Sequence, residues 1–436
     1  MSPNHVRRRR SPPLATARRG RSAIHPRIRI GIVTAAACVS LLPLLPAPTA
    51  ADVRPQIRAL LDRDPENGVV VYTLARMEDA AGDPAAVLAL LQRLLEMADW
   101  DHPLDSAKFP GTAAEPGFAE LAARLNARVP SVNRADTLQV LACLDLMPEG
   151  SAWDPGGRRL LLSSGHRRTV VAVEAGGACR DLVPEGRDGL LGVLGMEVDL
   201  QRGWLWVASA AGRYMRGWCD SLSGRAEVHA FDLATGATRG RWAAPHRPAL
   251  MNDLTVASDG TVYVTDTRGD MVLRIDPGST DLVRLDRPGV LVSPNGIALS
   301  TDGSAVVVAD LLGLVRIDRL SGAAERVAPA PDAGSARHLG GIDGLDRHGD
   351  DLIGIQNMVA PGRVWRLSLD AAGRRLLAAE LLEAGHPAFR TPTTGAVAGD
   401  DFLFVANPFL QTDGRSPLGP PPPGEQHVVL RLPLLP

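Results

Sequence analysis

The sequence predicts a mainly β fold: a six-bladed β-propeller preceded by a short α-helical, tetratricopeptide-like region. Three features carry this prediction. A strand–turn–strand motif recurs six times in residues 137–436, successive copies start 47, 56, 43, 48 and 51 residues apart, and a helical pattern is confined to residues 52–130. Four-stranded units repeated at such a period are typical of a propeller, where radial repetition protects the sheet edges.

The six copies share one plan, an apolar strand, a tight Asp/Gly turn and a second apolar strand ending in a small or polar residue. Their first positions are Glu149, Met196, Asn252, Asn295, Asp343 and Thr394. Most copies are followed by a further hairpin, such as MVLRIDPGSTDLVRL, which completes a four-stranded blade. The stretch DTLQVLACLD at residues 136–145 precedes the first copy, so we expect it to complete the sixth blade and close the ring.

The helical region contains a clear helix boundary. Gly82, Asp83 and Pro84 separate two stretches with apolar faces, and glycine ends helices, aspartate caps the next one and proline suits its first position. A third helix is expected in EPGFAELAARLNAR, residues 115–128. The pattern resembles one degenerate tetratricopeptide-type hairpin, too little for a peptide-binding superhelix. We expect it to pack against the propeller, with recruitment of a protein partner as a second role.

Charge is distributed unevenly along the chain. Residues 1–51 contain nine arginines and no acidic residue, which leaves 38 basic against 49 acidic residues, a net charge of −11, in the remainder. An acidic body argues against nucleic acid and anionic membranes as partners. The N-terminal order of basic stretch, apolar run (Ile30 to Leu45) and small residues predicts a secretory signal over residues 1–51 and hence an exported, periplasmic or extracellular protein. We expect cleavage near Ala50 or Ala51, with an uncleaved anchor as the alternative.

Export would leave three cysteines, Cys143, Cys179 and Cys219. An oxidising compartment favours a disulfide, and we expect Cys179 to pair with Cys219 because both fall in turns. The alternative is three buried free thiols. No Cys or Cys/His spacing indicates a structural zinc site.

The first position of each copy indicates the chemistry. The first strand of every blade lines the central channel, so equivalent positions converge there. Four of the six carry a carboxylate or an amide: Glu149 and Asp343 are carboxylates, and Asn252 and Asn295 are amides. Buried carboxylates and amides are costly without a partner. One divalent cation would provide it, with Ca²⁺ expected and Mg²⁺, Mn²⁺ or Zn²⁺ as alternatives; a water-filled polar channel without metal is the other interpretation.

Four motifs, PEGSAWDP, MNDLTVASDGTVYVTD, SPNGIALSTDGSAVVVAD and GIDGL, resemble those of the senescence marker protein/gluconolactonase/luciferin-regenerating enzyme (regucalcin-like) family. Paraoxonases and diisopropylfluorophosphatase are more distant parallels. The resemblance runs from about Thr137 to the C-terminus. It implies one catalytic metal held by Glu149, Asn295 and Asp343, with Asn252 contacting substrate or completing the metal shell. It also implies hydrolysis of a lactone or related ester.

In such a mechanism the cation acts as a Lewis acid, and Asp343 is the candidate general base for water. Leu250 departs from the family pattern, which has an arginine there, so a less polar substrate than a sugar lactone is favoured. Asp270 is a candidate substrate contact, or else a solvated hairpin residue. His246 is a candidate proton shuttle at the channel mouth, whereas His166 is expected at the surface.

Other functions compete with this one. No GxSxG, HExxH or phosphate-binding loop is present, so serine hydrolase, zinc protease and nucleotide-binding functions lack support. A non-catalytic exported propeller that binds a ligand or protein around a structural metal is the main alternative, because fold alone does not decide function. A strictosidine-synthase-like enzyme is a third, but it would not require the four oxygen-bearing side chains.

Overall fold

A computed structural model describes residues 54–329, 338–359, 362–408 and 425–435 of the 436-residue chain. The secretory signal expected over residues 1–51 lies outside these ranges. The described helices and strands belong to one compact unit of the chain. None of the described helices is long and apolar enough to cross a membrane.

Between residue 54 and the propeller the structure describes four α-helices: α2 (Arg54–Arg63), α3 (Gly68–Ala81), α4 (Pro84–Glu96) and α5 (Phe118–Asn126). Asn67 caps α3 by accepting a hydrogen bond from the Val70 amide, and Gly82 ends that helix in the left-handed conformation (φ 76°). Asp83 then caps α4, whose first residue is proline. The boundary predicted at Gly82, Asp83 and Pro84 is therefore confirmed in each of its three parts.

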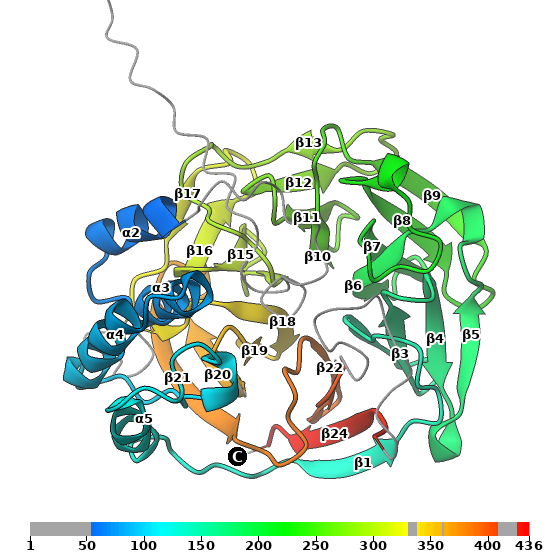
Figure 1. The fold of residues 1–436 in the computed structure, drawn as a ribbon. Coiled ribbons are helices and arrows are strands. Elements are labelled where there is room, and N and C mark those ends of the chain that lie inside the picture. The colour runs from blue at the N-terminus through cyan, green and yellow to red at the C-terminus, as the bar shows by residue number, and fades with distance from the viewer. Residues whose placement is uncertain (1–53, 330–337, 360–361, 409–424, 436) are drawn as a thin grey trace, which may run out of the picture. The chain divides into compact units, whose positions relative to one another are not determined.

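The rest of the described chain forms six four-stranded antiparallel sheets arranged around a common axis (Figure 1). Blade 1 contains β2 (Ser151–Asp154), β3 (Arg159–Ser164), β4 (Thr169–Val173) and β5 (Cys179–Val183). Blade 2 contains β6 (Gly192–Asp199), β7 (Trp204–Ala210), β8 (Ala226–Asp232) and β9 (Thr238–Ala243). Blade 3 contains β10 (Met251–Val256), β11 (Val262–Asp266), β12 (Met271–Ile275) and β13 (Val283–Arg284).

Blade 4 contains β14 (Ile297–Leu299), β15 (Ala305–Asp310), β16 (Gly313–Asp318) and β17 (Ala324–Arg326). Blade 5 contains β18 (Ile342–His348), β19 (Asp351–Gln356), β20 (Arg363–Leu369) and β21 (Leu376–Ala384). Blade 6 contains β22 (Gly395–Ala398), β23 (Asp401–Val405), β24 (Val428–Pro433) and, as its outer strand, β1 (Asp136–Val140). The predicted six-bladed propeller is confirmed, and so is its closure by the strand that precedes blade 1.

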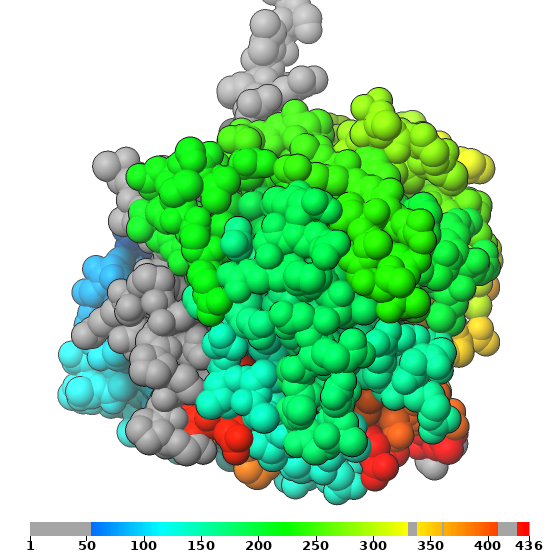
Figure 2. All heavy atoms as spheres, turned by 90° about the vertical axis from the view of Figure 1, so that its right-hand side faces the viewer, coloured from blue at the N-terminus to red at the C-terminus, as the bar shows by residue number. Residues whose placement is uncertain are grey.

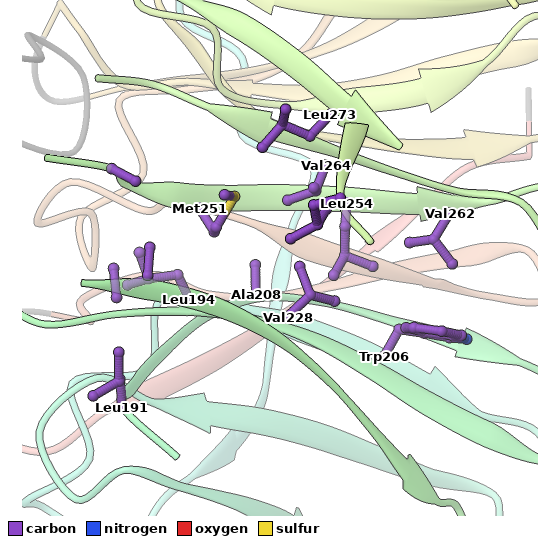
Figure 3. Packing of buried hydrophobic residues seen from close by; sticks show 14 of the residues in the cluster. Leu191, Leu194, Trp206, Ala208, Val228, Met251, Leu254, Val262, Val264 and Leu273 are labelled. Carbon is purple, nitrogen blue, oxygen red and sulfur yellow. The ribbon is translucent and has the colours of Figure 1, made fainter. Parts of the chain in front are cut away.

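Apolar side chains between neighbouring blades hold the ring together. Between blades 2 and 3, Leu194 of β6 lies in one cluster with Met251 and Leu254 of β10 (Figure 3). Comparable clusters lie between the other blades. Figure 2 shows the residues of blades 2 and 3, in green, next to each other on the side of the molecule that faces the viewer. Each fully buried aliphatic side chain contributes roughly 1.5–3 kcal/mol to stability, so blade-to-blade packing is the main stabilising term.

The disulfide expected between Cys179 and Cys219 is wrong. Cys179, at the start of β5, pairs with Cys143, and their Cα atoms lie 6.0 Å apart. The reason is the closing strand: the Ala142 amide donates to the Gly177 carbonyl, which brings the segment after β1 against blade 1. Cys219 is an exposed free thiol on the connection between β7 and β8.

The closure of blade 6 leads to a stability prediction. Leu430 on β24 is fully buried with Phe404, whereas Leu138 on the neighbouring β1 is 46 % exposed. We expect Leu430→Ala to lower the free energy of unfolding by about 2–5 kcal/mol, because it leaves a cavity between blades. Leu138→Ala is the matched control and should cost less than about 0.5 kcal/mol. Urea unfolding followed by tryptophan fluorescence measures both, and equal losses would contradict the packing described for β24.

Candidate metal centre

The inner strands of the blades, β2, β6, β10, β14, β18 and β22, lie next to one another around the channel. Close backbone contacts show which residues lie at the same level. A Cβ atom on Gly150 would lie 2.0 Å from the Leu194 carbonyl oxygen, and one on Gly195 would lie 2.6 Å from the Asn252 carbonyl oxygen. The equivalent positions, from blade 1 to blade 6, are therefore Glu149, Leu194, Asn252, Asn295, Asp343 and Thr394. We call these six residues the channel ring.

In blade 2 the structure differs from the sequence-based alignment, which placed Met196 in the ring. Leu194 occupies that level instead. The pairing of β6 with β7 shifts register between Val193 and Met196, and β10 and β18 have the same irregularity at their starts. Blade 2 differs from blades 3 and 5 in hairpin length. The residue before the ring position pairs with a residue 16 positions further on in blade 2 (Val193 with Ser209), 15 in blade 3 (Met251 with Asp266) and 14 in blade 5 (Ile342 with Gln356), so counting along the sequence fails there.

Two of the predicted ring ligands are in direct contact. The Asn295 side-chain amide donates a hydrogen bond to Oδ1 of Asp343. A second amide, from Asn357, donates to Oδ2 of Asp343 and to the Pro392 carbonyl at 3.0 Å. Sequence reasoning missed Asn357, which directly follows β19. The sequence offers little signal for it, because all six motif copies end in a polar residue and Asn357 does not differ from the others.

The other ring members differ in their environment. Nδ2 of Asn252 donates to Oγ1 of Thr267 at 3.1 Å, which leaves Oδ1 as the atom available for a cation or substrate. In the described part of the chain Asn252 makes no hydrogen bond to Glu149, Asn295 or Asp343. The Thr394 hydroxyl donates to the backbone carbonyl of Glu149 at 2.8 Å. Blades 2 and 6 therefore contribute no carboxylate or amide to the ring.

Glu149 carries the clearest sign of a missing partner. Its side chain is 2 % exposed, and neither carboxyl oxygen has a hydrogen-bond partner in the part of the chain that the structure describes. Burial, and secondarily the charges of Asp343 and Asp253, raise its pKa well above the usual value. Burial also raises the pKa of Asp343 to about 7, although hydrogen bonds from Asn357 and Asn295 oppose the shift. Two buried carboxyl groups that perturb each other are expensive unless a cation lies between them.

A recurring side chain-to-backbone bond fixes the loops that lead into the ring. In blades 1, 3, 4 and 5, a buried polar residue at the end of the second strand binds the backbone two or three residues before the ring residue. The bonds are Ser164 Oγ to the Leu146 carbonyl, the Leu250 amide to Asp266 (2.9 Å), the Val292 amide to Asp310 (2.9 Å) and Gln356 Nε2 to the Gly340 carbonyl (2.8 Å). We call these four residues the loop anchors. They occur in the same four blades that supply the carboxylate and amide side chains of the ring.

The donor set of the ring fits a hard divalent cation. Carboxylate oxygens from Glu149 and Asp343 and amide oxygens from Asn252 and Asn295 are the ligand types that Ca²⁺ prefers. Within the described ranges, no three His, Cys, Asp or Glu side chains gather in a group that could hold a metal ion, so the amides are essential to any such site. The all-oxygen chemistry favours Ca²⁺ over Zn²⁺, which takes nitrogen and sulfur ligands readily.

A second group of carboxylates lies deeper along the inner strands and was missed in the sequence. Glu197, Asp253 and Asp346 line a cavity of about 140 Å³. Burial is the first cause that raises the pKa of all three carboxyl groups. The neighbouring carboxylates raise the pKa of Glu197 and Asp253 further. Asp253 occupies the position next to Asn252 that is glycine in the other five blades, a difference the sequence displayed.

The tentative substrate residues lie near the ring loops and do not touch the ring. Nε2 of His246 is 2.8 Å from Oδ2 of Asp266, the loop anchor of blade 3. Asp270 accepts a hydrogen bond from the Ser293 amide at 2.7 Å, two residues before Asn295, and burial raises its pKa to about 7. Their roles toward a substrate stay predictions.

No protein-family model and no curated protein matches this sequence. Among solved structures, it is similar to a regucalcin described as calcium-binding from Agrobacterium tumefaciens, with 17 % identity, TM-score 0.46 and coverage of 70 % of this chain and 95 % of that one. A gluconolactonase from Xanthomonas campestris matches with 19 % identity, TM-score 0.43 and coverage of 70 % and 91 %. A virginiamycin B lyase from Staphylococcus aureus matches with 16 % identity, TM-score 0.43 and coverage of 62 % and 80 %. All three likenesses lie below 20 % identity and below a TM-score of 0.5.

The raised pKa values predict how pH acts on the cation-free protein. Because the folded-state pKa of Glu149 lies above its unfolded value, the folded state binds more protons, and stability falls as pH rises above about 4.5. Asp343 acts in the same direction, from about 4 up to about 7. In EDTA at pH 8 we expect Glu149→Gln to be about 1–3 kcal/mol more stable than the wild type, with a smaller difference at pH 5.

Thermal unfolding at the two pH values measures this difference, and adding Ca²⁺ should reverse it by stabilising only the wild type. Glu380→Gln, at an exposed carboxylate, is the control and should follow the wild type at both pH values. A Glu149→Gln variant that is less stable than the wild type at pH 8 in EDTA would contradict an unpaired charge at Glu149.

Asn357 generates a second prediction. Asn357→Ala removes the hydrogen bond that orients Asp343, and such outer partners of a metal ligand are typically worth 10- to 100-fold in affinity. We therefore expect a loss of about 10- to 100-fold in Ca²⁺ affinity, measured by calorimetry. Asn407→Ala is the control, because Asn407 is also buried and bonds only Gln426, Val428 and His427 in blade 6. An unchanged affinity in Asn357→Ala would remove Asn357 from the site.

Proposed function

We propose that this protein is a divalent-metal-dependent hydrolase of a lactone or related ester. The observation that carries the proposal is the pair of buried carboxyl groups, Glu149 and Asp343. Asp343 accepts hydrogen bonds from the amides of Asn295 and Asn357, whereas both carboxyl oxygens of Glu149 lack a hydrogen-bond partner among the described residues. Glu149, Asn252, Asn295 and Asp343 would hold the cation, Ca²⁺ being the expected ion. The resemblance in the four motifs supports a hydrolase, and an exported location remains part of the proposal.

When bound, the cation supplies Lewis-acid polarisation of a carbonyl oxygen. Side chains of the protein carry out the proton transfers and orient the reacting groups. Asp343 accepts a proton from the water whose oxygen attacks the carbonyl carbon. The ester C–O bond then breaks, and the leaving alkoxide takes up a proton to give the hydroxy acid. Asn295 and Asn357 fix the plane of the Asp343 carboxylate by donating to its two oxygens, which sets the direction in which it accepts the proton.

Residues around the ring loops would shape the substrate site. Leu250 offers an apolar contact two residues before Asn252, which favours a substrate less hydroxylated than a sugar lactone. Asn252 would donate to or accept from the substrate if it is not a metal ligand. His246, whose Nε2 lies 2.8 Å from Oδ2 of Asp266, would return the proton to the leaving oxygen.

The alternative function is a non-catalytic exported propeller that binds a ligand or a protein around a structural metal. The observation that favours it is the depth of the ring, since Glu149, Asn295 and Asp343 are each no more than 2 % exposed. A cation enclosed to that extent can stabilise a fold without reaching a substrate. The two functions differ in one measurable property, turnover.

The deciding experiment measures hydrolysis of a panel of sugar, aliphatic and aryl lactones by the purified protein after chelation and after addition of Ca²⁺, Mg²⁺, Mn²⁺ or Zn²⁺. We expect turnover to return with a cation and Asp343→Asn to lower kcat by at least about 100-fold, the usual minimum for a lost general base. Asp276→Asn, at an exposed aspartate paired with Arg274, is the control. Cation binding without turnover would establish the binding module, and absence of cation binding would refute both functions.

A further inference from the structure

We infer that the helical region is a fixed part of the candidate metal centre, and that His338 is the positioning residue through which it sets the place of Asp343. The inference rests on the proposed function only for its effect on cation binding. It assigns to the helices a role in the site itself and makes their fold inseparable from that of blade 5.

The helices lie on the face of the propeller at which the ring loops enter. Nδ2 of Asn67, the cap of α3, donates to the carbonyl of Leu312 in the turn between β15 and β16 at 3.2 Å. Arg363, at the start of β20, is 1 % exposed and forms an ion pair of 2.7 Å with Asp101, which follows α4. Figure 1 shows these helices in blue and cyan in front of blades 4 and 5, and Figure 2 shows them at the edge of that same face.

His338 is held by the helical region from several sides. Its Nδ1 accepts the backbone amide of Gly68, the first residue of α3, at 3.3 Å, and its Nε2 lies 3.3 Å from Oδ1 of Asp99. The ring of Trp100 packs edge-on against the imidazole with a centroid distance of 5.3 Å. His338 and Trp100 are each 1 % exposed, so water does not compete for these contacts.

From His338 the contacts lead to Asp343 in two short steps. Gln356, the loop anchor of blade 5, donates to the carbonyls of His338 (2.5 Å) and Gly340 (2.8 Å). The next residue, Asn357, donates to Asp343. The segment from His338 to Asp343 is therefore held by the helical region at its start and by the end of β19 along its length.

Among the described residues, the loops that carry the other three candidate ligands are not hydrogen-bonded to the helical region. The loops before Glu149, Asn252 and Asn295 are bound by anchors of their own blades, and no described hydrogen bond joins them to residues 54–130. Apart from the bond of Asn67 to Leu312 in the β15–β16 turn of blade 4, the hydrogen bonds described between the helices and the propeller are to blade 5, whose ring residue is the candidate general base.

Gly68 permits a test from the helical side. A Cβ atom there would lie 2.3 Å from Cε3 of Trp100 and 3.3 Å from Cε1 of His338, so Gly68→Ala must push α3 and the Trp100–His338 pair apart. Taken alone, alanine favours a helix more than glycine by about 1 kcal/mol. If the helical region had no influence on the site, the displacement would stay within residues 54–130 and leave the backbone of residues 339–347 and cation binding unchanged.

The experiment compares wild type, Gly68→Ala, His338→Leu and His338→Asn by hydrogen–deuterium exchange of residues 339–347 and by Ca²⁺ calorimetry. We expect Gly68→Ala and His338→Leu to accelerate exchange there at least tenfold and to weaken Ca²⁺ binding at least tenfold, with exchange in β10 unchanged. His338→Asn should recover part of both, because its side-chain oxygen can accept the Gly68 amide. Arg58→Ala, which breaks an ion pair with Glu78 inside the helical region, is the control and should match the wild type.

Exchange and affinity within twofold of the wild type in both Gly68→Ala and His338→Leu would overturn the inference, as would an equal change in Arg58→Ala. Faster exchange in a protein that binds no Ca²⁺ even as wild type would keep the inference and refute the proposed function, so the two failures can be told apart.

Discussion

The side chain-to-backbone bond made by each loop anchor is the interaction on which the candidate site depends. A propeller positions its inner strands well where their hydrogen bonds are complete, but the ring residues lie just before those strands or at their irregular starts, where the sheet holds the backbone incompletely. Ser164, Asp266, Asp310 and Gln356 remove that freedom by binding the loop within the same blade. A buried polar group left without this bond would cost about 1–3 kcal/mol, so loop and anchor stabilise each other.

The ring that these anchors hold is asymmetric. Blades 1, 3, 4 and 5 supply carboxylate or amide side chains, while blade 2 supplies Leu194 and blade 6 supplies Thr394, whose hydroxyl is engaged with the Glu149 carbonyl. The hydrogen bonds are concentrated where Asn295, Asp343 and Asn357 meet. Glu149, on the other side, has none on its carboxyl oxygens. One side of the ring is thus fixed by hydrogen bonds, and the other presents an unsatisfied carboxyl group that a cation would satisfy.

Much of this arrangement could be predicted from the sequence, because local rules decide it. The helix boundary at Gly82, Asp83 and Pro84 follows from capping chemistry alone. The six blades could be predicted because each contains a strand–turn–strand motif with a short Asp/Gly turn that is recognisable in the sequence. Glu149, Asn295 and Asp343 were identified because a repeated fold places repeated positions at the same level.

The features that could not be predicted depend on geometry between strands. Leu194 lies in the place expected for Met196 because the β6–β7 hairpin is longer than those of blades 3 and 5, and periodicity carries no information about the length of one hairpin. The pairing of Cys143 depended on where the closing strand passes blade 1. Asn357 lies at the end of a second strand, so its contact with Asp343 needs the path of the chain between strands. The position of the helices could not be predicted either. Their amphipathic faces predict packing against the propeller. The contacts of Gly68, Trp100 and His338 show that this packing is against the loop that carries Asp343.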